Sequence, residues 1–148
     1  MERGAVQVPL LVLVLRVVFG LVSAFGQTAG GVRLELRRVW VSEGRIWLGF
    51  KAWNRSAIDF RADPVRFAIR SRRAFKRRAL QEIRLVPVVR QEPRILRSDS
   101  TISFSDALAP RVPGKGQELV VEWVERDGDR RVRVRVKAKK LLKARKVR

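Results

Sequence analysis

The sequence predicts an all-β protein, and three observations support that prediction. Apolar and polar residues alternate from Val65 to Ser71, which is the period of a strand with one buried face. The dipeptide Asp127-Gly128 lies between two strand-like runs, which is typical of a hairpin turn. No segment after Val32 has the apolar spacing of a long helix. About seven short strands in one domain indicate an immunoglobulin-like β-sandwich, with a small open barrel as the alternative.

The N-terminal segment differs from the rest of the chain because residues 6–22 are almost wholly apolar. Small residues follow, so residues 1–26 are predicted to be a signal peptide, cleaved after Gly26 or, alternatively, after Ala24. Residues 27–148 then form the β-sandwich domain. A membrane anchor is a second interpretation, although a span needs ~20 apolar residues and Arg16 would cost ~2.5–3.5 kcal/mol. A buried core element is a third.

Residues 33–41 and 45–53 are predicted to form the first hairpin, with Glu43-Gly44 as its turn. If those two residues are the whole loop, Trp40 faces Trp47 across the pair. The opposite face also carries apolar residues: Val39, Val41, Ile46 and Leu48. Apolar groups on both faces are expected for strands inside a sandwich. We therefore expect the tryptophan pair to belong to the core rather than to a ligand platform.

Shorter strands separated by turn signals are predicted in the middle of the chain. They are expected over residues 58–60, 65–71, 83–89 and 101–104. Residues 91–99 are polar and contain Pro93, which predicts a loop. Residues 110–116 contain two prolines and two glycines, which predicts a turn-rich connection.

The last hairpin is predicted around Asp127-Gly128, and both turn residues are expected to take positive φ. Counting outward from that turn gives three apolar pairs on one face: Trp123 with Val132, Val121 with Val134, and Leu119 with Val136. On the other face Glu122 lies opposite Arg133, and such a pair contributes ~0.2–1 kcal/mol. The tail over residues 137–148 is expected to be a frayed, solvated terminus, with a short basic amphipathic helix on an anionic surface as the alternative.

Composition limits the chemistry that this chain can perform. Lys and Arg number 34 against 14 Asp and Glu, a formal charge of +20, which suits an anionic partner or, alternatively, a solvated arginine-rich surface. The chain contains no Cys, His or Tyr, which removes the usual nucleophiles, general base and zinc ligands. The acidic residues form no spaced cluster, and no phosphate-binding glycine motif is present. We therefore expect no enzyme, no cofactor and no metal.

A dense basic connection follows the strand that ends in Arg66-Phe67-Ala68-Ile69-Arg70 and leads into Lys76-Arg77-Arg78-Ala79-Leu80-Gln81-Glu82. This segment resembles the C-terminal domain of the TraN-type proteins of Bacteroidetes conjugative transposons. Those proteins carry a strand R-F-x-I-R, a short basic run and a block close to K-R-T-A-I-Q-E, with threonine where this chain has Arg78. Residues 50–56, ending in Asn54-Arg55-Ser56, and residues 119–128 are similar to two further segments of that family.

The resemblance implies a non-catalytic structural component of a conjugative transfer apparatus. Such proteins look like the periplasmic β-sandwich subunit of the outer-membrane core complex in type IV secretion. The implied location is the periplasm, with outer-membrane association through partners. The implied partners are other subunits of the apparatus and further copies of the chain, docked by strand addition to a sheet edge.

Five residues of the matched block are the predicted partner contacts: Lys76, Arg77, Arg78, Gln81 and Glu82. In the alternative interpretation, Gln81 and Glu82 only tie the basic connection to the sheet. A second functional hypothesis is an exported basic module that binds nucleic acid or an anionic envelope surface. Its predicted contacts are Arg70, Arg72, Arg73, Phe75, Lys76 and Arg77.

Overall fold

The computed structural model describes residues 25–71 and 82–147, and within these residues it confirms an all-β sandwich. Its strands are β1 (Phe25–Ala29), β2 (Val32–Ser42), β3 (Arg45–Asn54), β4 (Phe60–Arg61), β5 (Arg66–Ser71), β6 (Glu82–Leu85), β7 (Ile95–Leu96), β8 (Ser100–Leu108), β9 (Gln117–Val124), β10 (Arg131–Lys137) and β11 (Arg145–Lys146). Only α2 (Ala138–Leu142) is helical in this part of the chain. Most of the predicted signal peptide lies outside the described residues, while its last two residues begin β1.

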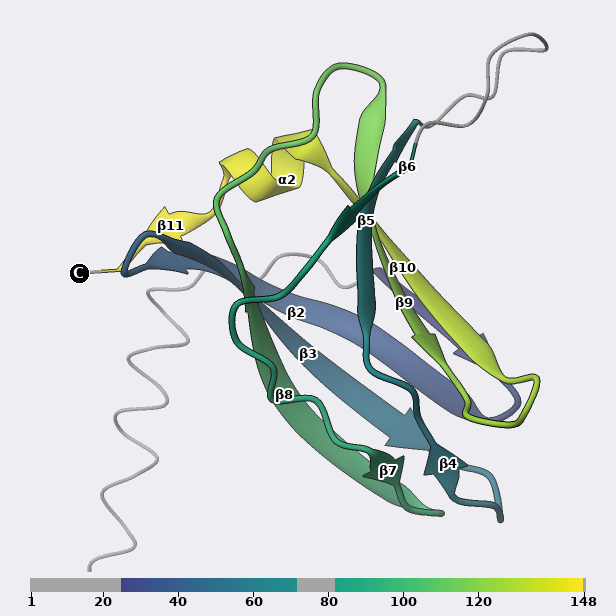
Figure 1. Cartoon of the computed structure of the whole chain (residues 1–148). Coiled ribbons are helices and arrows are strands. Elements are labelled where there is room, and N and C mark those ends of the chain that lie inside the picture. The colour runs from purple at the N-terminus through teal and green to yellow at the C-terminus, as the bar shows by residue number, and fades with distance from the viewer. Residues whose placement is uncertain (1–24, 72–81, 148) are drawn as a thin grey trace, which may run out of the picture.

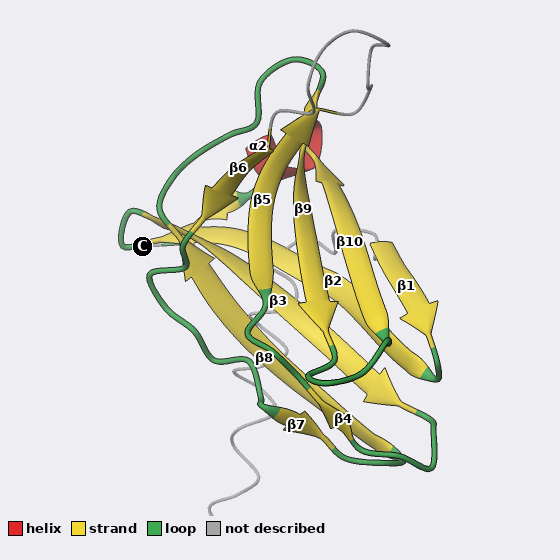
Figure 2. Cartoon of the chain, turned by 45° about the vertical axis from the view of Figure 1, so that its right-hand side comes forward, coloured by secondary structure: helices red, strands yellow, loops and turns green. Residues whose placement is uncertain are grey.

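Two antiparallel sheets form the sandwich (Figure 1). One sheet has the order β1-β2-β3-β8, with β11 added in parallel to β2, and the other has the order β10-β9-β5-β6. β4 and β7 form a separate two-stranded pair. Figure 2 shows β1 beside β10, so the two sheets approach each other at that side of the sandwich.

The core lies between the sheets and is organised around Trp123 of β9, which is fully buried. The rings of Phe60 and Phe104 pack against it, with ring centroids 5.0 Å and 5.6 Å away. Phe50 continues the stack, with its centroid 5.2 Å from that of Phe104. Alternate residues of both sheets fill the remaining space, as the period of a strand requires. No helix among the described residues is long and apolar enough to cross a membrane.

The β2–β3 hairpin has the predicted register, with Trp40 opposite Trp47 and a turn in which Glu43 and Gly44 both take positive φ. The prediction that the tryptophan pair belongs to the core is wrong. The two rings stack on the outer face of the sheet, with centroids 5.8 Å apart and planes 9° apart, and both residues are only half-buried. Val39 and Leu48 point into the core instead. Because both faces of the hairpin are apolar, the pattern did not reveal which face meets the second sheet.

The β9–β10 hairpin also has the predicted register, and Glu122 pairs with Arg133 at 2.7 Å. One detail is wrong, because Asp127 takes positive φ but Gly128 does not. The last cross-strand bond joins the Glu125 amide to the Arg130 carbonyl at 2.8 Å. The Arg126 amide donates to the Arg61 carbonyl instead, at 2.7 Å. The tip is therefore a wider loop, held by a contact outside the hairpin.

Three expectations for the middle of the chain need correction. Residues 91–99 contain β7, because Leu96 is buried and pairs with Phe60. The strand predicted over 101–104 continues to Leu108, since it remains paired with β3 along its whole length. The strand predicted over 83–89 ends at Leu85, before Pro87. The chain then crosses to the other sheet, where the Val88 amide donates to the Ala107 carbonyl at 2.8 Å.

The tail is docked and not frayed, so that expectation is also wrong. α2 places Leu141 in the core with 5% of its surface exposed. β11 then pairs in parallel with β2, and the Val147 amide donates to the Val41 carbonyl at 2.7 Å. Leu141, with Ala144 packed against the same core and β11 paired with β2, anchors a segment that is otherwise rich in lysine.

Candidate partner-binding site at the β5–β6 edge

Two of the predicted site residues, Arg70 and Glu82, lie within the described residues. The others lie outside them: Arg72, Arg73, Phe75, Lys76, Arg77, Arg78 and Gln81. The predicted contacts of those residues stay predictions. The described part of the site consists of the two strands that flank the basic connection, β5 and β6.

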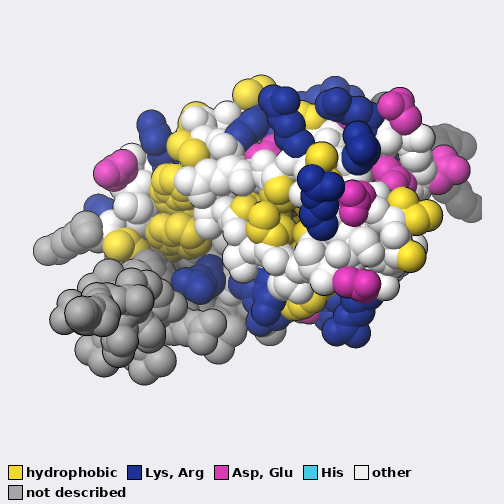
Figure 3. All heavy atoms as spheres, turned by 90° about the horizontal axis from the view of Figure 1, so that it is seen from below, with side chains coloured by type: hydrophobic (Ala, Val, Ile, Leu, Met, Phe, Trp, Pro, Cys, Tyr) yellow, Lys and Arg dark blue, Asp and Glu magenta, His cyan; other side chains and the backbone are white. Residues whose placement is uncertain are grey.

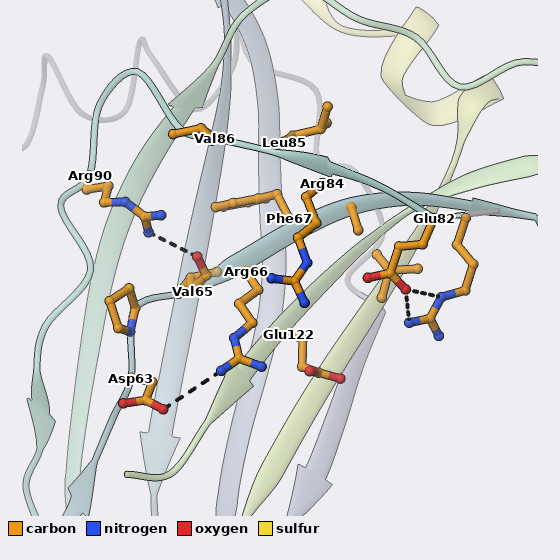
Figure 4. A pocket seen from close by; sticks show the side chains of 14 residues that line it. Asp63, Val65, Arg66, Phe67, Glu82, Arg84, Leu85, Val86, Arg90 and Glu122 are labelled. Atoms are coloured by element: carbon orange, nitrogen blue, oxygen red, sulfur yellow. Dashed lines mark hydrogen bonds and ion pairs between the residues drawn. The ribbon is translucent and has the colours of Figure 1, made fainter. Parts of the chain in front are cut away.

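Arg70 and Glu82 face each other at the ends of β5 and β6, where the basic connection leaves and returns. Arg70 donates from Nε and from a terminal guanidinium nitrogen to the same carboxylate oxygen of Glu82, at 3.2 Å and 2.7 Å (Figure 4). A two-point contact of this kind is stronger and more directional than a single ion pair. For Glu82 the arrangement supports the interpretation that it ties the connection to the sheet.

β6 is the edge of its sheet, and within the described residues no strand pairs with its outer side. An edge strand presents unpaired backbone amide and carbonyl groups, to which another strand can add. Besides the charged residues Glu82 and Arg84, three apolar side chains on or after β6 are exposed: Ile83 by 37%, Val86 by 80% and Val88 by 49%. Exposed apolar residues beside an open edge are typical of an interaction surface.

A groove of about 370 Å³ runs along the outer face of β5, beside this edge. In Figure 4, Arg84 of β6 extends to the same side of β5 as Arg66, with Glu122 of β9 also lining the groove. Arg66 lies 3.9 Å from the Asp63 carboxylate. Arg90 donates to the Val65 carbonyl at 3.0 Å and so closes one end. The groove combines charges of both signs, which suits a polypeptide better than a purely anionic ligand.

The acidic groups of this face lie close to arginines. Burial raises the pKa of Glu122, but the hydrogen bond from Arg133 and the charges of Arg131 and Arg66 outweigh that effect and leave the pKa below its ordinary value. Glu118 lies 3.8 Å from Arg135 in the same sheet.

Sequence reasoning missed a buried acid pair, Asp106 and Glu92, beneath the segment that joins the two sheets. Asp106 is fully buried and accepts the Gln91 amide at 2.7 Å. Glu92 accepts the Val65 amide at 3.1 Å. Burial is the main cause that raises the pKa of Asp106 to about 7, and the nearby Glu92 carboxylate adds to the rise. The signal in the sequence was an acidic residue between two inward-facing apolar residues, Phe104 and Leu108.

Sequence reasoning also missed what Asn54 and Ser56 do, although it singled out that segment. Asn54 is buried and donates from its amide to the carbonyls of Ile58 and Leu96, at 2.9 Å and 3.1 Å. Its side-chain oxygen accepts both the amide and the hydroxyl of Ser56. The pair therefore organises the turn after β3 and joins it to β7, which is a structural role. Within the described residues, no group of three or more Asp or Glu side chains is placed to hold a metal ion.

Comparison with protein-family models matches residues 20–146 to a family described as "Domain of unknown function (DUF4138)". The match spans both sheets, the basic connection and the docked tail. A comparison with curated proteins found no match.

Proposed function

Because the chain belongs to the DUF4138 family, whose description names no activity, we propose a function from its residues: it is a non-catalytic structural component of a conjugative transfer apparatus in the cell envelope. The proposed partners are other subunits of the apparatus, with self-association as a second mode. The observation that carries the proposal is the open β6 edge beside the basic connection.

The geometry of that edge supports docking by strand addition. A partner strand laid along β6 would satisfy its outward-facing backbone groups, and side-chain pockets would supply specificity. Ile83 and Val86 would be covered by the partner, which removes exposed apolar surface from water. The Arg70–Glu82 contact holds both ends of the basic connection beside this edge. The proposed contacts Lys76, Arg77, Arg78 and Gln81 lie on that connection.

The resemblance to TraN-type proteins supports the proposed setting. The matched block around residues 76–82 and the N-terminal apolar segment together suit a protein exported to the periplasm, where partners associate it with the outer membrane. The formal charge of +20 favours acidic partner surfaces and speeds encounter with them.

Conjugation frequency tests the proposal directly. A donor strain that lacks the gene is complemented with the wild-type chain, with the edge variant Ile83→Asp/Val86→Asp, or with the control variant Ile58→Asp/Val112→Asp. The control replaces residues that are also exposed, by 70% and 44%, and that belong to segments other than β6. We expect the deletion and the edge variant to lower transfer strongly, and the control variant to restore it.

Cell fractionation supplies a second readout. The wild-type protein should appear in the envelope fraction, shortened at its N-terminus. Transfer that is unchanged by the deletion, or a full-length protein in the cytosol, would contradict the proposal.

A further inference from the structure

The outer face of the other sheet carries a hollow that the proposed function does not use. It has a volume of about 510 Å³ and lies over Gly49 of β3. A side chain at this position would begin 3.2 Å from Cζ3 of Trp40, so the missing side chain leaves room beside that ring. Ser103 and Ser105 of β8 line the opposite side. Cavities of this size accept one small organic group.

Cations surround the hollow. Arg37, Arg38 and Lys51 line it, and none of its described lining residues is acidic. Glu35 lies outside the lining and is already paired with Arg33 and Arg37, at 2.5 Å and 2.8 Å. Within the described residues, no ion pair neutralises Arg38 or Lys51. The hollow is therefore positive, which suits an anionic ligand.

Indole rings alternate with these cations along β2 and β3. Trp53 has three cationic groups around it: Arg33 at 5.7 Å from the ring centroid, Arg37 at 5.3 Å and Lys51 at 5.1 Å. Contacts of this type hold the cations close to the sheet and limit their motion. Trp40, which lines the hollow, stacks on Trp47 of the neighbouring strand. Figure 3 shows Lys and Arg side chains spread over one face of the molecule, with hydrophobic groups and some Asp and Glu side chains between them.

We propose that this aromatic–cationic face (Arg37, Arg38, Trp40, Gly49, Lys51 and Trp53) binds single-stranded nucleic acid. A base enters the hollow over Gly49, next to the ring of Trp40. The flanking phosphates contact Arg38 and Lys51. Proteins that bind single strands combine aromatic platforms with a basic track in this way. The inference rests on the face itself and does not depend on the proposed function.

The shape of the face favours this ligand over two other anionic partners. A bilayer surface is bound by apolar side chains that protrude, whereas here a half-buried ring, that of Trp40, borders a recess lined by cations. An acidic peptide offers carboxylates but no flat ring to occupy the recess. A nucleotide offers both the ring and the negative charge.

Fluorescence anisotropy of the full chain with a labelled oligothymidylate of about twelve nucleotides tests the proposal. The site variant is Arg38→Gln/Lys51→Gln. The control variant is Arg111→Gln/Lys139→Gln, which removes the same charge at exposed positions away from the hollow. We expect the site variant to bind about tenfold more weakly. The slope of log affinity against log salt concentration should fall in magnitude by about 1.4, because each of the two lost phosphate contacts on a single strand contributes about 0.7. The control variant should change both quantities much less.

Further probes distinguish the contribution of the base to binding from that of the phosphate charge. An abasic strand of equal length should bind about fivefold or more weakly than the oligothymidylate, since stacking is lost while the phosphates remain. Vesicles of phosphatidylglycerol and poly-glutamate should compete poorly. Four results would each overturn the proposal. The site and control variants could lose affinity equally, or the abasic strand could bind as tightly as the oligothymidylate. The protein could bind vesicles or poly-glutamate more tightly, or it could bind no oligothymidylate at low salt. Thermal unfolding confirms that each variant is folded.

Discussion

Arg130 and Glu125 form a two-point ion pair at the tip of the β9–β10 hairpin, with nitrogen–oxygen distances of 2.9 Å and 2.5 Å. The same guanidinium donates to the Asp59 carbonyl at 2.8 Å and to the Ser56 hydroxyl at 3.0 Å, and it lies 5.3 Å from the centroid of the Phe60 ring. One side chain therefore joins the hairpin to the turn between β3 and β4. Side chains of both members of the pair are about 15% exposed, at 16% and 15%.

Replacing Arg130 with alanine should lower the free energy of unfolding by about 2–3 kcal/mol, because hydrogen bonds to a charged group are lost and Glu125 remains without its partner. Urea denaturation of the full chain measures this change. Arg111→Ala, at an exposed position, serves as the control and should stay within about 0.5 kcal/mol of wild type. Equal effects in the two variants would show that Arg130 is not a structural link.

Asp106 should make the protein less stable as the pH rises. Its pKa is raised from 3.8 to about 7 in the folded chain, so the folded state keeps a proton that the unfolded state has already released over this range. Stability from this group is therefore present below pH 4 and is lost as the pH approaches 7. Glu92 adds to the rise in pKa and Arg90 opposes it.

Asp106→Asn should remove that dependence, because a neutral amide can still accept the Gln91 amide. At pH 8 we expect the variant to be more stable than wild type by about 1–3 kcal/mol, the cost of a buried charged group without full pairing. Urea denaturation at pH 5 and pH 8 provides the comparison. If the variant were equally destabilised at pH 5 and at pH 8, Asp106 would be ionised over this whole pH range in the folded wild-type protein.

Acid should destabilise the protein through three other carboxylates. The pKa of Asp59 is lowered, chiefly by the hydrogen bond from the Ser98 amide, and that of Glu125 is lowered, chiefly by the hydrogen bond from Arg130. The pKa of Glu122 is also lowered. Their contribution is present above the ordinary carboxylate pKa and is lost as the pH falls through the folded values. Thermal unfolding below pH 4 should show this loss of stability. The loss should be smaller in the Arg130→Ala variant, in which Glu125 has no arginine partner.

Leu141 should account for the docking of the tail. Leu141→Ala is expected to lower stability by about 2–3 kcal/mol, because a buried leucine is lost and the site around it collapses only partly. Leu142→Ala is a matched control one residue away, since Leu142 is 69% exposed, and should change stability by less than about 0.5 kcal/mol. Similar values for the two variants would contradict the packing of α2 against the core.

Asn54 should be sensitive to substitution because its buried amide donates to the Leu96 carbonyl, which no other side chain reaches within the described residues, and also to the Ile58 carbonyl, which the Ser56 hydroxyl and Arg130 contact as well. Asn54→Ala is expected to cost about 2–4 kcal/mol, and Asn54→Asp nearly as much, since a carboxylate accepts from Ser56 but cannot donate to Ile58 and Leu96. Ser56→Ala removes one hydroxyl and should cost about 1 kcal/mol. An Asn54→Asp variant as stable as wild type would show that the Leu96 carbonyl finds another donor.

Local features of this protein could be predicted where neighbouring residues in the sequence are also neighbours in space. The registers of Trp40 with Trp47 and of Glu122 with Arg133 follow from the length of a turn and the two-residue period of a strand, and both are observed. The candidate site could be predicted only in part. Arg70 and Glu82 were each singled out for a different role, and their contact with each other was not predicted. Asp106 and Glu92 belong to segments whose approach no local pattern specifies.

The sequence by itself determined the all-β class, the two main hairpins and their pairing, because alternation and turn chemistry act over a few residues. Only the tertiary structure decided which face of the β2–β3 hairpin became the core, where the lysine-rich tail docked, and that Arg38, Lys51 and three tryptophans share one outer surface. Those outcomes depend on how one sheet packs on the other. Packing selects among faces that are equally apolar in the sequence, and it does so through contacts between residues far apart in the chain.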